Sequence, residues 1–300
     1  MPLTVWSSAR YTFPLPEGHR FPVEKYAMLR ERVVAEGIVA AERVLDPAAA
    51  TDDMLRLVHT ADYVGRFVRG AMSEAELRRL GFPWSAALVE RSRRAVGGTV
   101  AAARHALAHG AAMNLAGGTH HAFPDHGEGF CVFNDVAIAI RLLRAEGLVR
   151  RVAVIDLDVH QGNGTHAIFA GDPAVYTFSM HGRRNYPFEK VAGTMDIDLE
   201  DGTEDAEYLA RLGAALPRVL HAAQPDLVVY LAGADPHERD RLGRMKLTFA
   251  GLERRDGMVL ASCREVGLPV AVVIAGGYGA RIEDTVAAHV ATARIAAASG

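Results

Sequence analysis

Cysteine is scarce in this 300-residue chain, which contains only Cys131 and Cys263. Two cysteines cannot build the disulfide framework of a small secreted domain, and we expect both to be small buried apolar side chains. No apolar stretch reaches about 18 residues without a charge, so no membrane-spanning helix is expected. The chain also opens without the basic and then apolar segment of a secretory signal. These absences favour a cytoplasmic protein with no membrane partner.

An excess of positive charge is also missing, since the formal net charge is −3 and the isoelectric point is near 6.5. This balance argues against direct binding of nucleic acid through bulk electrostatics. Half of the residues are hydrophobic, which is enough for a large core. No repeat, low-complexity segment or flexible linker divides the sequence, so we expect residues 1–300 to form a single catalytic domain.

Apolar runs and helical periodicity alternate in the second two thirds of the chain. We expect strands at 112–116, 152–157, 175–179, 227–232 and 270–275, and helices at 133–146, 204–223, 249–266 and 282–298. Upstream, we expect a short strand at 5–6, helices at 24–44, 61–69 and 84–108, and a short helix capped by Thr51. Strands that are apolar on both faces indicate an α/β three-layer sandwich with a mostly parallel central sheet. Ligands of such sheets bind beyond the carboxyl ends of the strands.

The end of the second long strand carries an unusual load of polar groups: Asp156, Asp158, His160 and Asn163. Strand alternation would place Asp156, Asp158 and His160 on one face. Carboxylates together with imidazole suit zinc or another divalent transition metal. The alternative is a pair of aspartates that form turns or cap the next helix.

Other strand ends supply the groups that would complete such a site. Asp235 follows the fourth long run, and with Asp158 and His160 it gives three metal ligands and leaves coordination open. The adjacent His120 and His121 follow the first run and suit acid and base roles, although one surface and one core histidine would be the plainer explanation. Tyr278 follows the fifth run, and its phenol could donate to an oxyanion or simply pack at the sheet end.

Together these motifs resemble the zinc-dependent histone deacetylase family of the arginase/deacetylase superfamily, over roughly residues 11–290. The motifs that carry the resemblance, in family order, are Gly118-Thr119-His120-His121, Gly129-Phe130-Cys131 with Asn134-Asp135, Asp156 to Gly164, Gly233-Ala234-Asp235 and Gly276-Gly277-Tyr278. Three further stretches resemble the class IV branch and its bacterial relatives: 17–22, 185–187 and 240–243.

The resemblance implies a role for each matching residue. Asp158, His160 and Asp235 would bind one Zn²⁺ per chain, with Fe²⁺ as the alternative, and a structural K⁺ would lie beside Asp156 and backbone oxygens near His160 and Ser179. His120 and His121 would flank the attacking water. Tyr278 would bind the substrate carbonyl, and the remaining substrate-binding positions would be Gly129, Phe130 and Gly277. The opposite tunnel wall is a phenylalanine in many members; here only Tyr186 and Phe188 are candidates.

The two histidines are expected to differ because their implied partners differ in charge. Asp156 beside His120 would favour the imidazolium, whereas Asn163 beside His121 would orient the ring without stabilising its charge to the same degree. We therefore expect His121 to be the base that activates water and His120 mainly to stabilise negative charge.

The resulting prediction is a metal-dependent amidohydrolase that removes an acetyl or longer acyl group from the lysine side chain of a protein or peptide. The alternatives are a deacylase of acylpolyamines or other small acylated amines, and a non-catalytic acyl-lysine binder. A binuclear manganese ureohydrolase would need another aspartate near Asn163. Several arginines crowd the loops after the third and fourth long strands and indicate a solvated face or, alternatively, attraction of an anionic substrate group: Arg183, Arg184, Arg239, Arg241 and Arg244.

Overall fold

A computed structural model describes residues 2–299 of the chain, and its eight strands form one sheet in which every pairing is parallel. The strands are β1 (Val5–Trp6), β2 (Val44–Leu45), β3 (Ala111–Asn114), β4 (Val152–Asp156), β5 (Val175–Gly182), β6 (Met195–Leu199), β7 (Leu227–Leu231) and β8 (Val270–Val273). Their order across the sheet is β2-β1-β3-β8-β7-β4-β5-β6. The predicted α/β class with a largely parallel sheet is therefore confirmed.

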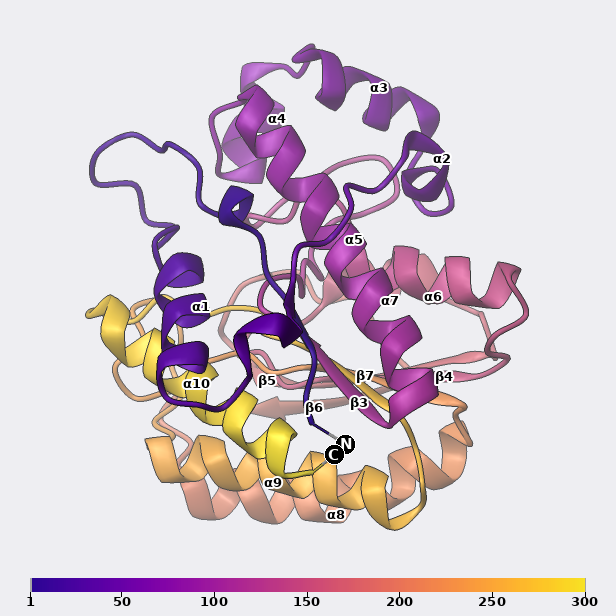
Figure 1. Ribbon diagram of the computed structural model, residues 1–300, viewed down its shortest axis with the longest axis vertical. Helices are drawn as coiled ribbons and strands as arrows, with labels where there is room; N and C mark the ends of the chain where they lie inside the picture. The colour runs from indigo at the N-terminus through magenta and orange to yellow at the C-terminus, as the bar shows by residue number, and fades with distance from the viewer. Residues whose placement is uncertain (1, 300) are drawn as a thin grey trace.

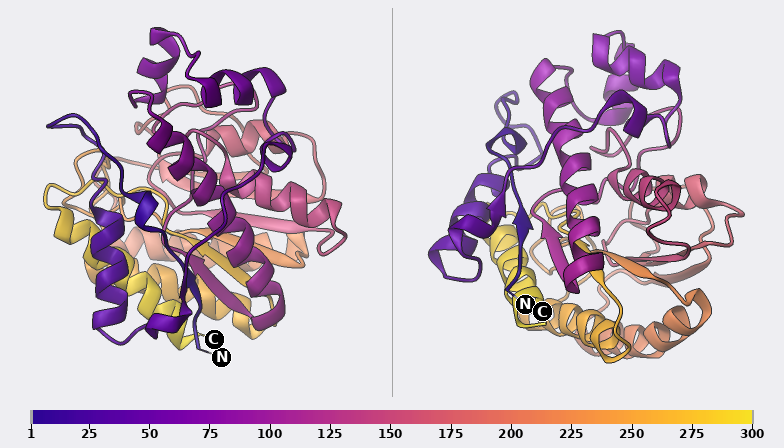
Figure 2. Two further views of the ribbon diagram at one scale, coloured as in Figure 1. Left: turned by 45° about the horizontal axis from the view of Figure 1, so that its top comes forward. Right: turned by 45° about the vertical axis from the view of Figure 1, so that its right-hand side comes forward.

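Helices cover both faces of this sheet. They are α1 (Lys25–Ala35), α2 (Asp52–Leu55), α3 (Ala61–Arg69), α4 (Glu74–Leu80), α5 (Ala86–His109), α6 (Asp135–Ala145), α7 (Asn163–Phe169), α8 (Asp205–Ala223), α9 (Phe249–Glu265) and α10 (Ile282–Ala298), with short 3-10 turns at Ala9–Tyr11 and Ala41–Arg43. Figure 1 shows α5, α6 and α7 on one side of the sheet and α8 and α9 on the other. The two further views in Figure 2 show the same layers and the group of α2, α3 and α4 beyond the end of α5.

Two cores lie between these layers, one on each face of the sheet. Val152 and Val154 of β4 enter the core under α5 and α6, whereas Ala153 and Ile155 enter the core shared with α8 and α9. Successive side chains of a strand point to opposite faces, so a strand covered on both sides must be apolar throughout. This explains why the long runs carry no alternation of polar residues.

The long helix α5 approaches its neighbours closely at two glycines. A Cβ at Gly97 would overlap the carbonyl oxygen of Ala48, and one at Gly98 would lie 2.6 Å from the hydroxyl of Tyr11. The side chain of Ser85 caps the start of the helix by accepting from the amide of Leu88 at 3.1 Å.

The amino-terminal region departs from the sequence prediction. The helix expected over 24–44 ends at Ala35, because Gly37 takes a left-handed φ of 66° and the amide of Ile38 bonds to the carbonyl of Val33. The chain then forms a 3-10 turn and the edge strand β2. Helices α4 and α7 and the edge strand β6 were not predicted.

Two predictions from the scarcity of cysteine and of long apolar runs can be compared directly. Cys131 and Cys263 are both free and buried, as expected. Among residues 2–299, no helix combines the length and the apolar character that crossing a bilayer requires.

Candidate active site

The carboxyl ends of the parallel strands meet at one edge of the sheet, and a pocket of about 650 Å³ opens there. Its floor includes His121, His160 and Tyr278, which follow three different strands. A smaller hollow beneath it is lined by His120, Asp158 and Gly276, among others. The sheet therefore gathers the residues that the sequence analysis placed at separate strand ends.

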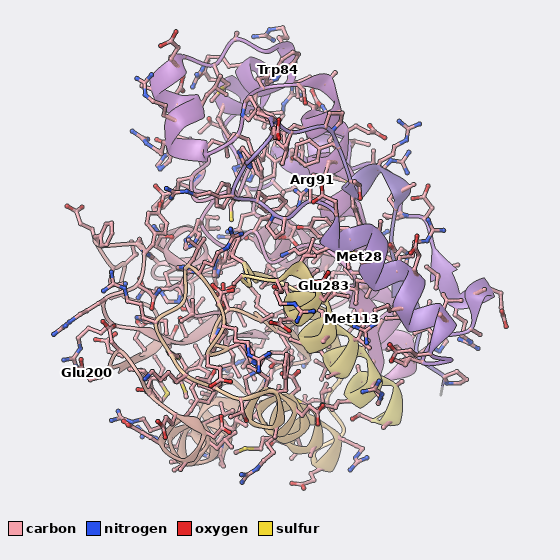
Figure 3. The ribbon with its side chains drawn as sticks, turned by 90° about the vertical axis from the view of Figure 1, so that its left-hand side faces the viewer. Met28, Trp84, Arg91, Met113, Glu200 and Glu283 are labelled. Atoms are coloured by element: carbon pink, nitrogen blue, oxygen red, sulfur yellow. The ribbon has the colours of Figure 1, made fainter. Side chains whose placement is uncertain are left out.

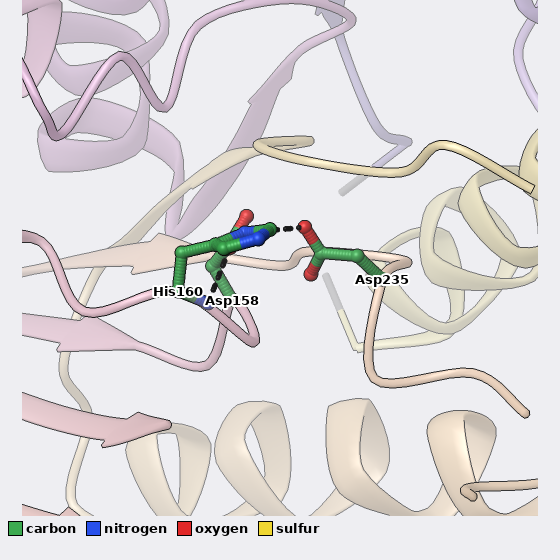
Figure 4. A group of neighbouring side chains, drawn as sticks. All are labelled: Asp158, His160 and Asp235. Atoms are coloured by element: carbon green, nitrogen blue, oxygen red, sulfur yellow. Dashed lines mark hydrogen bonds and ion pairs between the residues drawn. The ribbon is translucent and has the colours of Figure 1, made fainter. Parts of the chain in front are cut away.

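Asp158, His160 and Asp235 form the centre of this site. One potential ligand atom from each residue lies within 4.8 Å of the others, and all three residues are buried. The Nδ1 atom of His160 is 3.0 Å from Oδ1 of Asp158 and 3.2 Å from Oδ2 of Asp235 (Figure 4). The three predicted metal ligands are thus brought together.

A turn, rather than a continued strand, presents these groups. Strand β4 ends at Asp156, and the amides of Asp158 and His160 donate to the carboxylates of Asp156 at 3.2 Å and Asp158 at 2.9 Å. The predicted placement of Asp156, Asp158 and His160 on one strand face is therefore wrong, because alternation stops before Asp158. The aspartates do form a turn, and the same turn assembles the cluster.

The three side chains fit a divalent metal ion. Oδ2 of Asp235 is buried and accepts no hydrogen bond from residues 2–299. Burial, and then the nearby Asp158 carboxylate, raise the pKa of Asp235 to about 7. A Cβ at Gly276 would overlap that same Oδ2 atom, so glycine is required where the backbone passes the cluster. A cation bound by both carboxylates would remove the repulsion that raises this pKa.

The histidine pair lies beside the cluster with the predicted partners. Nδ1 of His120 is 2.7 Å from Oδ2 of Asp156, and Nδ1 of His121 is 2.7 Å from Oδ1 of Asn163. The two imidazole rings are 4.2 Å apart between centroids, and both residues are buried.

The surroundings give the two histidines opposite protonation preferences. Burial opposes the charged form of His120, but Asp156 and Asp158 outweigh it and raise its pKa to about 9. Burial, followed by the charges of His120 and His160, lowers the pKa of His121 well below its usual range.

Tyr278 borders the same space from the loop after β8. Its ring centroid is 6.4 Å from that of His160, and burial raises the pKa of its phenol well above the usual value, so the hydroxyl remains a donor. The amide of Tyr278 donates to Asp240 at 2.6 Å, and Nζ of Lys25 donates to the Gly277 carbonyl at 3.3 Å. These contacts fix the loop that carries the tyrosine.

Gly129 and Phe130 form one side of the pocket in an unusual backbone conformation. Both have positive φ angles, 55° and 65°, and Phe130 packs against Phe82 with ring centroids 5.2 Å apart. A positive φ is uncommon for a bulky residue and is typical of sites where side-chain direction matters. Of the two candidates for the other wall, Tyr186 lies 4.9 Å from the ring of His121, whereas Phe188 is 83% exposed at the rim.

Two residues that complete the site were not predicted from the sequence. Arg91 of α5, labelled in Figure 3, is buried, donates to the Tyr26 hydroxyl at 2.7 Å and lies over the ring of Phe21. Glu128 accepts from the amide of Asn163 at 2.7 Å. Arg91 could have been noticed as an arginine among the apolar positions of α5. No sequence pattern distinguished Glu128.

Comparison with known proteins agrees with this arrangement. A model of the histone deacetylase domain matches residues 19–294. An uncharacterized protein of Picosynechococcus sp. is 47% identical over 93% of each chain. Histone deacetylase 2 of Arabidopsis thaliana is 32% identical over 87% of this chain and 70% of its own.

Solved structures show the same fold. The crystal structure of a histone deacetylase homologue from Aquifex aeolicus superposes with a TM-score of 0.87 at 24% identity, over 99% of this chain and 84% of that one. The family model spans every strand end that contributes to the site. The chain therefore belongs to the histone deacetylase family of hydrolases, as the sequence motifs predicted.

Proposed function

We propose that this protein is a zinc-dependent deacylase that removes an acetyl or longer acyl group from the lysine side chain of a protein or peptide. The observation that carries the proposal is the meeting of the Asp158–His160–Asp235 cluster with the histidine pair and Tyr278 around the pocket and the smaller hollow that adjoins it. The family assignment and the relative named histone deacetylase 2 support the same chemistry.

Asp158, His160 and Asp235 are the residues that would hold the metal. Three protein ligands leave a coordination position open, as catalytic zinc sites do. When bound, zinc would supply a Lewis acid that polarises the acyl carbonyl and makes water a better nucleophile. Fe²⁺ is the alternative ion for this ligand set. A structural K⁺ beside Asp156 remains part of the proposal, and the register of the sheet pairs Asp156 with Ser179.

His121 is proposed as the general base. Its lowered pKa keeps the imidazole neutral, so the ring can take the proton of the attacking water and return it to the departing amine. His120, held by Asp156 and biased toward the imidazolium, would stabilise the negative charge that develops on the acyl group.

The remaining residues would bind the substrate or fix the loop that carries Tyr278. The hydroxyl of Tyr278 would donate to the carbonyl oxygen as it becomes an oxyanion. The Gly129 carbonyl would accept the N–H of the scissile amide, Phe130 and Tyr186 would enclose the lysine methylenes, and the Gly277 carbonyl, fixed by Lys25, would keep the tyrosine loop in place.

A substrate panel tests this proposal directly. Zinc-loaded protein is offered acetyl-lysine peptides, fatty-acyl-lysine peptides and acetylpolyamines, with Asp235→Ala as the inactive control. We expect hydrolysis of acyl-lysine peptides by the wild type alone. Hydrolysis only of acetylpolyamines would establish the small-amine alternative. Tight peptide binding without turnover would establish a non-catalytic acyl-lysine binder.

A further inference from the structure

The mouth of the active-site pocket is basic on several sides. Five exposed arginines line it, here called the mouth arginines: Arg20, Arg78, Arg79, Arg184 and Arg244. They come from four separate segments, namely the loop before α1, the end of α4, the turn after β5 and the loop between β7 and α9. Within residues 2–299, no aspartate or glutamate lines this pocket.

This group differs from the arginine cluster predicted from the sequence. Of the five arginines expected near the mouth, only Arg184 and Arg244 line the pocket. Arg183 instead bonds to Glu200 at 2.6 Å, and Arg239 lies 3.6 Å from Asp284. The basic character of the mouth arises from segments far apart in the sequence, which a run of charges could not indicate.

Most of the charge at the mouth is not neutralised by the protein. In the part of the chain that the structure describes, no carboxylate oxygen lies within ion-pair distance of Arg20, Arg79 or Arg184. Arg78 and Arg244 each have one carboxylate partner at 3.3 Å, but both side chains are more than half exposed, so these pairs hold them weakly. An arginine guanidinium can bind a carboxylate through two parallel hydrogen bonds. The unpaired mouth arginines could therefore bind carboxylates of a substrate in this way.

We propose that the substrate is an acyl-lysine within an acidic peptide segment, with aspartate or glutamate within a few residues of the lysine. The proposal rests on the deacylase function proposed above. Arginines on several sides of the mouth fit carboxylates on both sides of the inserted lysine, whereas a small amine with one anionic group would use only one side. The rim residue Phe188 offers an exposed ring for the peptide to cover.

Acyl-lysine peptides of one backbone sequence, flanked by glutamate, glutamine or lysine, test the proposal. We expect kcat/KM for the glutamate peptide to exceed that for the lysine peptide by about tenfold or more at low salt, mainly through KM, and the ratio to shrink as salt screens the charges. Replacing Arg20, Arg79 and Arg184 together by glutamine should remove most of the preference, because only Arg78 and Arg244 then remain at the mouth. Arg218→Gln on the exposed surface of α8, away from the mouth, is the matched control and should retain it.

Binding measurements separate this proposal from the deacylase function. Fluorescence anisotropy of the same peptides gives the charge preference whether or not they are hydrolysed. Hydrolysis without any preference among the three flanks would overturn the acidic-substrate proposal and leave the function standing. Free Nε-acetyl-lysine hydrolysed as well as the glutamate peptide would also overturn it, in favour of a small anionic amide.

A second inference concerns the side-chain amide of Asn163, in which Oδ1 can only accept a hydrogen bond and Nδ2 can only donate. Glu128 has 14% of its side-chain surface exposed, and Oε1 of its carboxylate accepts from Nδ2 of Asn163 at 2.7 Å. A carboxylate that is ionised can only accept, so the amide oxygen must face His121. That oxygen can only accept as well, which places the proton of a neutral His121 on Nδ1 and leaves Nε2 free.

We infer that Glu128 is a positioning residue that sets the tautomer of His121 through Asn163. With its orientation fixed by Glu128, the Asn163 amide would select the Nδ1–H tautomer of His121 as strictly as an aspartate at position 163 would. Among residues 2–299, the Glu128 carboxylate pairs with Asn163 and His126 and with none of the predicted metal ligands. Burial opposes its ionisation, but hydrogen bonds from His126, Asn163 and Tyr186 outweigh burial and lower its pKa.

The test combines Glu128→Gln with Asn163→Asp. Glu128→Gln alone should lower kcat several-fold with little change in KM, because the amide of residue 163 can then turn around. In the Asn163→Asp background, Glu128→Gln should not lower kcat, because both oxygens of an ionised aspartate can only accept the His121 Nδ1–H. Nitrogen-15 NMR of His121 should show loss of the single Nδ1–H tautomer in Glu128→Gln, independently of turnover. An unchanged tautomer, or equal losses of kcat in both backgrounds, would overturn the inference.

Discussion

Tyr278 combines burial with a hydroxyl that cannot ionise at neutral pH, which suits a hydrogen-bond donor to developing charge. Losing one donor of this kind costs about 2.7–4 kcal/mol in the transition state. We therefore expect Tyr278→Phe to lower kcat by about a hundredfold or more while zinc still binds. Steady-state kinetics with metal analysis of the purified variant checks this. Normal turnover would remove the tyrosine from the mechanism.

The two histidines should respond differently to replacement. His121→Ala removes the base and should cost about 10²–10⁴ in kcat. His120→Ala removes a charged group that only assists, so it should cost less and keep measurable turnover at neutral pH. Parallel kinetics of the two variants at equal metal content is the measurement. The opposite ranking would make His120 the base.

Some residues of the site could be predicted from the sequence and others could not. Asp158, His160 and Asp235 could be predicted because a strand end is a fixed place in a parallel sheet, whatever the turn beyond it does. The direction of their side chains could not, since the turn after Asp156 replaces strand alternation. Glu128 reaches the site through a loop with no periodicity, so only the folded chain reveals its contact with Asn163.

At the scale of single elements, α5 provides a test of close packing. Replacing glycine by alanine inside a helix usually stabilises it by about 0.5–1 kcal/mol. Gly97→Ala should instead destabilise the protein, because its Cβ would overlap the Ala48 carbonyl oxygen. Gly257→Ala in α9 is the control, since nothing lies within 4 Å of its Cβ, and it should stabilise. Urea denaturation compares the two, and equal effects would contradict the packing argument.

Helix α4 begins with a capping box whose contribution depends on pH. Ser73 donates to the Glu76 carboxylate from its amide at 2.8 Å and its hydroxyl at 2.7 Å, and these bonds, with Arg66, lower the pKa of Glu76 to about 2. A lowered folded-state pKa contributes stability above the unfolded value near 4.5, and that stability is lost as pH falls toward 2.

Glu76→Gln should therefore lower the free energy of unfolding at pH 7, and the difference from wild type should shrink as pH falls below about 4.5. The side chain is 25% exposed, so we expect a modest effect. Chemical denaturation at several pH values measures it. A difference that grows toward low pH would contradict the assignment.

Two of the elements that were not predicted, β6 and α7, lack the sequence pattern of a long buried element. Strand β6 reads Met-Asp-Ile-Asp-Leu and lies at the sheet edge with alternate residues exposed, so it lacks the continuous apolar run of a central strand. Helix α7 has only seven residues, too few for a period to show, and most of them are buried. Prediction succeeded for central strands and long helices because burial on both faces leaves the strongest sequence pattern.

The whole molecule brings together groups that are more than 150 residues apart in the chain. His120, Asp158, Asp235 and Tyr278 meet because β3, β8, β7 and β4 are consecutive neighbours in the sheet and all run in one direction. The topology of the sheet thus brings the site residues to one edge, and the turns after the strands set the distances between their side chains. The order of the strands was not readable from the sequence, because the apolar runs specify burial but not pairing partners.

Metal binding should stabilise the whole fold, since its ligands join the loops after β4 and β7. A ligand at a hundred times its Kd adds about 2.7 kcal/mol to the folded state. At about 2 °C per kcal/mol for a chain of this size, zinc should raise Tm by about 5 °C or more over protein treated with a chelator. Calorimetry with and without zinc measures the shift.

Asp235→Asn gives this prediction its control. The variant should lose the zinc-dependent rise in Tm because one carboxylate ligand is gone. Without metal at neutral pH the variant should be at least as stable as the wild type, because an asparagine removes the repulsion between the buried carboxylates of Asp158 and Asp235. Burial and this repulsion raise the pKa of Asp235 to about 7. If zinc left the wild-type Tm unchanged, or if chelator-treated Asp235→Asn were markedly less stable than chelator-treated wild type, the cluster would be a structural hydrogen-bond network rather than a metal site.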